Sequence, residues 1–191
     1  MLIKHKYLLT YRYSEIIHDL TIEFTRKYVL GYLSNLNQKP DYRTSDQMNQ
    51  AARSGKQNIV EGVGQEKTSK KGEIKLLGVA NASLEELITD LEDFLRQHNL
   101  EIWLKNDKSI ADFRKIGFRL TAFSNLSDPG ELKEKPILPK NPENAANFLL
   151  TLCHQATFLL SRQIAKMEEI FIREGGYSEN LFKKRLNSKI K

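Results

Sequence analysis

The segment Glu15-Ile-Ile-His18 carries the residue types and spacing of a metal-binding helix. A Glu-x-x-His motif places a carboxylate and an imidazole on one helix face. Carboxylate-bridged metal pairs in helical bundles need two such motifs and two further inward-facing glutamates. No second copy exists, because neither His98 nor His154 has a glutamate three residues earlier. We therefore interpret the motif as a chance match and predict no metal site.

Two other groupings contain residue types used in catalysis. Cys153 and His154 are adjacent, but neighbours on a helix point about 100° apart, so they do not make a nucleophile–base pair. Glu86, Asp90 and Asp93 share one helix face opposite an apolar face, which is typical of a solvated surface. The sequence thus predicts a protein that is not an enzyme and needs no cofactor.

Lysines gather where a long helix is expected to begin. Lys67, Lys70 and Lys71 lie at the predicted helix entrance. The positive end of a helix favours anions over cations, so these lysines are mildly unfavourable unless they meet a phosphate or carboxylate. Two interpretations stay open, an anion-binding site and ordinary solvated loop lysines.

A polar seam is predicted along the segment before that helix. Gln47, Ser54, Asn58 and Glu61 recur at helical spacing beside a stripe of small residues. Buried polar groups need partners, since each unsatisfied one costs about 1–3 kcal/mol. The seam is either a hydrogen-bonded network that fixes helix register or a recognition site.

Apolar side chains at helical spacing predict an all-α chain. The expected helices cover residues 14–36, 44–62, 69–98, 110–123 and 141–175, with a short basic helix over 179–188. Expected boundary signals are a Thr44/Gln47 capping box, a terminating Gly62, and Asn141-Pro142 as cap and first residue. Gly55, inside a helix, indicates close approach of another backbone.

These segments predict one domain, a four-helix bundle over residues 14–175, with an insertion at 99–141 and a basic tail at 176–191. The insertion adds an extra helix before the last core helix. Four of the five prolines fall between residues 129 and 142, so 127–140 is expected to be an extended connection.

Composition narrows the class of protein further. The net charge is +6, but residues 173–191 hold six basic and two acidic side chains, so most of the excess lies in the tail. The single cysteine, Cys153, excludes an internal disulfide and suits a reducing compartment. The sequence has no apolar run of about 20 residues, the length that a membrane span needs. It also predicts no secretory signal peptide, so we expect a cytoplasmic protein.

Residues 44–62, TSDQMNQAARSGKQNIVEG, resemble the signature of bacterial four-helix-bundle proteins encoded by intervening sequences in large-subunit ribosomal RNA genes. The resemblance rests on an Ala-Ala-x-Ser and Asn-Ile-x-Glu-Gly pattern and a later Ala-x-x-Ser-Leu-x-Glu-Leu pattern. The matching residues are Ala51, Ala52, Ser54, Asn58, Ile59, Glu61 and Gly62, then Ala80, Ser83, Leu84, Glu86 and Leu87. The string is most similar to the branch called the four-helix-bundle suffix domain.

The resemblance implies an antiparallel up-and-down bundle that assembles into a ring, typically a pentamer, with no established enzymatic activity. A looser relative, the accessory variability protein of diversity-generating retroelements, binds nucleic acid and a reverse transcriptase. Our first hypothesis is therefore a self-assembling bundle that binds a macromolecular partner, with RNA as the candidate. Its phosphate contacts would be Arg53, Lys56, Lys67, Lys70 and Lys71.

Two alternatives stay open. A protein-only interaction module would use an apolar patch around Trp103 or the helix over 110–123. A metal-dependent bundle enzyme is the third hypothesis, which elemental analysis of the purified protein would test.

Overall fold

All regular secondary structure in the part of the chain that the structure describes is helical, without a strand. The computed structural model describes residues 4–31, 40–66, 68–122 and 134–189. A 3-10 turn, Lys4–Tyr7, precedes the helices; these are α1 Leu9–Phe24 with a π-helical extension Thr25–Leu30, α3 Tyr42–Gln65, α4 Lys70–Gln97, α5 Lys108–Thr121, α6 Pro142–Glu174 and α7 Tyr177–Lys189. The predicted all-α class is confirmed.

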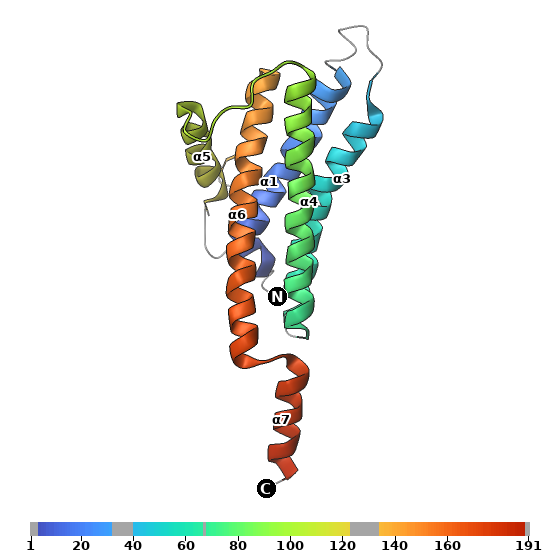
Figure 1. The fold of residues 1–191 in the computed structure, drawn as a ribbon, viewed down its shortest axis with the longest axis vertical. Coiled ribbons are helices and arrows are strands. Elements are labelled where there is room, and N and C mark those ends of the chain that lie inside the picture. Colours follow the sequence, from blue (N-terminus) through green and yellow to red (C-terminus); the bar gives the residue numbers. More distant parts are fainter. Residues whose placement is uncertain (1–3, 32–39, 67, 123–133, 190–191) are drawn as a thin grey trace.

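Four long helices lie alongside one another and enclose the apolar core (Figure 1). α3 packs against α4 and α1, and α6 packs against α4 and α1. Each helix contributes fully buried side chains to a single cluster, including Ile16, Ile17, Leu20, Met48, Ile59, Leu77, Leu84, Leu91, Leu149 and Leu152. Burying one such side chain contributes about 1.5–3 kcal/mol, so these stripes supply the main stabilisation.

Side-chain caps mark the starts of α3, α4, α5 and α6, although not always the predicted caps. Ser69 Oγ accepts from the Gly72 N–H at 3.0 Å, and Asn141 Oδ1 accepts from the Glu143 N–H at 2.8 Å, so both predicted starts are confirmed. The predicted Thr44 cap is wrong. Asp41 Oδ1 accepts from the Thr44 N–H at 3.0 Å and begins α3 earlier. A carboxylate there is also favoured by the helix dipole.

Gly55 within α3 allows α4 to approach closely. A Cβ on Gly55 would lie 2.9 Å from Leu84 Cδ2 and 3.6 Å from the Ala80 carbonyl oxygen, in line with the predicted close approach. Gly62 was expected to end the helix, and that prediction is wrong. It is buried inside α3, where an added Cβ would lie 3.5 Å from the Glu73 carbonyl oxygen, and the helix continues to Gln65.

The ends of the chain also differ from the predicted boundaries. α1 begins at Leu9 rather than Ser14, and it buries Tyr11 and Tyr13. The predicted ends at Leu36 and Phe123, and part of the predicted connection, lie outside the described residues. Gly175, at φ 75°, ends α6 as predicted, and the basic helix α7 projects beyond the four packed helices (Figure 1). No helix in the described ranges is long and apolar enough to cross a membrane.

Candidate functional site

The lysines and arginine predicted to contact phosphates are distributed over two places. Arg53 and Lys56 lie in α3, and Lys70 and Lys71 lie in the first turn of α4. About 14 Å of helix separates Lys56 from the end of α3, at 1.5 Å per residue. Lys67 lies outside the described residues. The structure therefore does not gather these residues into one cluster.

Two of these cations already have partners in the chain. Lys56 Nζ lies 3.0 Å from His18 Nδ1, and Lys70 Nζ forms an ion pair with Glu174 Oε2 at 3.0 Å. The cation of Lys56 is among the causes that lower the pKa of His18, after burial of the ring. Arg53 and Lys71 are exposed to solvent. Their assignment to a nucleic-acid contact stays a prediction.

Further cations lie on α7, at the same end of the molecule as the start of α4. The Lys70–Glu174 pair ties the start of α4 to the end of α6, next to which α7 begins (Figure 1). α7 exposes Lys183, Lys184 and Arg185, and none of these three forms an ion pair with a described residue. Phe182, beside them, is 61 % exposed. We call Lys71 and these three α7 cations the basic end.

The predicted polar seam divides into a bonded part and an exposed part. Ser54 Oγ lies 2.9 Å from Ser83 Oγ of α4, and Asn58 Nδ2 donates to Ser54 Oγ at 3.1 Å. Ser83 Oγ also donates to the Val79 carbonyl at 3.0 Å. Gln47 and Glu61 are exposed and lie outside this network. The bonded serines and Asn58 are the arrangement expected of groups that fix the register of α3 against α4.

The groupings with catalytic residue types do not converge. Glu15 Oε1 accepts a hydrogen bond from Tyr11 Oη at 2.9 Å, whereas His18 faces Lys56. Cys153 is fully buried, and burial raises the pKa of its thiol, whereas His154 is exposed on the next face of α6. Among the described residues, no three histidine, cysteine or acidic side chains gather as metal ligands would.

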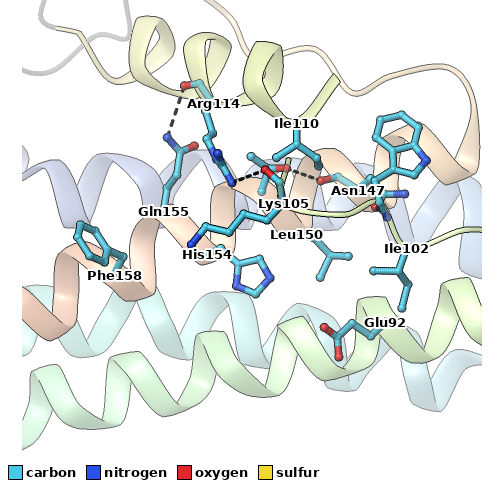
Figure 2. A pocket seen from close by; sticks show the side chains of 12 residues that line it. Glu92, Ile102, Lys105, Ile110, Arg114, Asn147, Leu150, His154, Gln155 and Phe158 are labelled. Carbon is cyan, nitrogen blue, oxygen red and sulfur yellow. Dashed lines mark hydrogen bonds between the residues drawn. The ribbon is translucent and has the colours of Figure 1, made fainter. Parts of the chain in front are cut away.

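The insertion forms a pocket of about 550 Å³ against α6 and α4 (Figure 2). Ile102 and Trp103 precede α5, Ile110 and Arg114 belong to α5, and Glu92 belongs to α4; α6 supplies Asn147, Leu150, Thr151, His154, Gln155 and Phe158. Pockets of this size with an apolar floor and a few polar groups are typical of ligand or partner sites.

Trp103 is fixed in the wall of this pocket by hydrogen bonds and stacking. Its backbone N–H donates to Asn147 Oδ1 at 2.9 Å, and its indole Nε1 donates to Glu143 Oε1 at 3.0 Å. Its ring stacks on Phe113 at 5.7 Å. Trp103 was predicted to centre an exposed patch, but it is partly buried. Its chain neighbours Ile102 and Leu104 are exposed, Leu104 at 72 %, and Phe158 of α6, which lines the same pocket, is 61 % exposed.

Lys105 and Arg114 of the pocket were not predicted as site residues. Arg114 donates to the Lys105 carbonyl at 3.2 Å, and Gln155 Nε2 donates to the Arg114 carbonyl at 3.4 Å (Figure 2). Both cations lie in polar stretches of the insertion without a spacing that marks them. Only the packing of α5 on α6 brings them to one opening, so the sequence held no signal for them.

Comparison with known protein families identifies the segment that holds the polar seam. Residues 15–109, about half of the chain, match the model of the 23S rRNA-intervening sequence protein family. The protein belongs to this family. The match spans α3, α4 and most of α1, and it ends at the start of α5. No curated protein and no solved structure matches the chain significantly. The closer resemblance to the suffix-domain branch of the intervening-sequence family stays a prediction.

Proposed function

We propose that this protein is a non-enzymatic RNA-binding bundle that acts as a homo-oligomer, in the form of an antiparallel up-and-down four-helix bundle with α5 inserted before the last core helix. The observation that carries the proposal is the basic end, where α7 exposes three cations that are not ion-paired in the described chain. Membership of a ribosomal-RNA-related family supports RNA as the partner. The single cysteine is in keeping with a cytoplasmic site of action.

The chemistry of the basic end suits RNA. Lysine and arginine neutralise phosphates, and this term dominates nucleic-acid affinity at low salt. Unstacked RNA bases also stack on exposed aromatic rings, and Tyr177 and Phe182 of α7 are 51 % and 61 % exposed. A helix that extends away from the packed core can reach phosphates without a steric clash between RNA and bundle.

The test is RNA binding with matched charge-removal variants. An RNA hairpin with single-stranded ends is titrated by fluorescence anisotropy against the full chain and against the triple variant Lys183→Ala/Lys184→Ala/Arg185→Ala. We expect at least about a tenfold loss of affinity and a salt dependence shallower by about 2 in log–log slope, from three lost contacts. The control removes Lys105, Lys108 and Lys115, three exposed cations of the insertion, and should bind as the parent does.

An equal loss of RNA affinity in both triple variants would mean that binding depends on net charge alone and not on the basic end. RNA affinity that does not change with salt concentration would contradict the proposal. The oligomer is tested separately, by light scattering of the chain after chromatography. A ring predicts a mass several times that of the 22.1 kDa chain, and a monomer at micromolar concentration would contradict it.

A protein-only interaction module is the second candidate, and the pocket beside Trp103 favours it. Exposed Ile102 and Phe158 line this pocket, and exposed Leu104 stands in the chain between the lining residues Trp103 and Lys105. Exposed apolar side chains of this kind typically mark protein contacts. Loss of a co-purifying protein on Leu104→Ser/Phe158→Ser, with RNA binding unchanged, would favour this function over the first.

A further inference from the structure

A second pocket, of about 480 Å³, lies near the basic end and contains a buried acid. Its walls come from four separate parts of the chain: the N-terminal segment, the end of α3, the first turn of α4 and the C-terminal third of α6. The lining residues are Lys4, Tyr7, Leu8, Val63, Glu66, Lys70, Glu73, Gln163, Met167 and Ile170. The pocket is distinct from the one formed by the insertion.

Glu73 is the polar centre of this pocket. Its side chain is 5 % exposed, and its Oε2 has no hydrogen-bond partner among the described residues. A buried charged group without a partner is costly, and native structures rarely keep one without a reason. The sequence contains the signal for this burial, because Glu73 stands four residues before Leu77 on the apolar stripe of α4.

The cations that line the pocket are engaged by other carboxylates. Lys4 Nζ pairs with Glu66 Oε2 at 2.8 Å, and Lys70 Nζ pairs with Glu174 Oε2 at 3.0 Å. Gln163 Oε1 accepts from Thr10 Oγ1 at 2.9 Å. No described side chain therefore donates a hydrogen bond to Glu73 Oε2, and the pocket offers an acceptor for a donor from outside.

We propose that this pocket binds a small alkylamine in its protonated form, with the ammonium group on the Glu73 carboxylate and the hydrocarbon chain along the apolar walls. Leu8, Val63, Met167 and Ile170 provide those walls. An ammonium group donates three hydrogen bonds and is attracted by the carboxylate, and charge-assisted bonds of this kind are roughly twice as strong as neutral ones. The site is independent of RNA binding.

Binding should depend on pH. Burial, followed by repulsion from Glu66, raises the pKa of Glu73 to about 7, whereas Lys70 and Lys4 lower it. The other groups that face it are Tyr7 of the N-terminal turn and the neutral Gln163 of α6. An ammonium ion binds the ionised carboxylate, so its affinity should rise as pH increases through 7.

The experiment uses methionine methyl groups as reporters in the full chain. Of three methionines, Met167 lines the pocket and Met48 is fully buried in the bundle core away from it. Protein labelled with 13C at the methionine methyls is titrated at pH 8 with n-hexylamine, and in parallel with the neutral 1-hexanol. We expect a saturable shift of the Met167 signal, an unchanged Met48 signal, and about tenfold weaker binding of the alcohol.

The variant Glu73→Gln should lower hexylamine affinity to that of hexanol, and the control Glu86→Gln, an exposed α4 residue, should leave it unchanged. Glu73→Gln removes a buried charge, so its melting temperature above pH 7 should rise. If that variant fails to fold, the wild-type chain is titrated at pH 6 instead. Hexylamine should then bind about tenfold more weakly than at pH 8, whereas the affinity for hexanol should be the same at both pH values. Equal affinity for both probes, unchanged binding in Glu73→Gln, or no saturable Met167 shift would overturn the proposal.

Discussion

The contact between α3 and α4 and the contact between α5 and α6 both depend on a glycine, yet they have different results. Gly55 lets Leu84 of α4 pack directly against the α3 backbone. Gly117 of α5 does the same for α6, where an added Cβ would lie 2.8 Å from Leu152 Cδ2 and 2.7 Å from Gln155 Oε1. Around Gly55 the first contact is filled by the fully buried Ala80 and Leu84, whereas the second lies beside the open pocket that Ile110 and Arg114 line.

The difference follows from length and from what surrounds each contact. α3 and α4 run side by side over many turns, so apolar side chains fill the space between them, and the Ser54–Ser83 hydrogen bond fixes their register. α5 is shorter and contacts α6 and α1 at one side only. Its other support is the Trp103–Phe113 stack. A tight contact thus stabilises the bundle in one region and shapes a site in the other.

The largest expected effect is on the contact between α3 and α4. Leu84→Ala removes a fully buried side chain and leaves a cavity, so the free energy of unfolding should fall by about 3 kcal/mol. Urea denaturation followed by circular dichroism measures it. The loss should be global, with amide protection reduced in α3, α4 and α6 together. A loss below about 1 kcal/mol would mean that this contact is not the tighter of the two.

A smaller and local effect is expected at the second contact. Gly117→Leu forces atoms into Leu152 and Tyr13, at a cost of about 2 kcal/mol, and α5 should separate from α6. Hydrogen exchange should then speed up in α5 and leave α3 and α4 protected. Gly78→Leu is the matched control, because nothing lies within 4 Å of a Cβ at that position. If protection from hydrogen exchange fell equally in all helices, the two contacts would not differ in the way described.

The smallest effect is expected in the polar seam. Ser54→Ala should lower the free energy of unfolding by about 1 kcal/mol, since Ser83 keeps its bond to the Val79 carbonyl and Asn58 keeps its bond to the Ser54 carbonyl. A double-mutant cycle with Ser83→Ala measures the coupling in thermal unfolding. If the two losses simply add, the hydroxyls do not act together in fixing the register.

Several features were predictable because they depend on neighbours in sequence. Apolar spacing located every long helix, and Ser69 and Asn141 marked two starts, since a cap involves only the next few residues. The Thr44 and Gly62 predictions failed for the same reason. Each fits a local rule, but Asp41 is also a good cap, and Gly62 lies buried in a helix that continues to Gln65. Local patterns alone do not rank such alternatives.

The candidate sites were less predictable. Among the predicted cations, Lys70 and Lys56 proved to be paired with Glu174 and His18, which are far away in sequence. Lys105 and Arg114 meet His154 only because the insertion packs on α6. Glu73 was detectable by its position on an apolar stripe, but its missing partner was not, because a partner could have come from any helix.

The amino-acid sequence by itself determined that this chain is helical, which faces of its helices are apolar, and which family its residues 15–109 belong to. Those properties depend on periodicity and on short motifs. Tertiary structure alone decided which cations stay unpaired, where α5 leaves a pocket, and that Glu73 lies buried beside an open space. Such properties depend on distances between residues remote in sequence, which are set by packing.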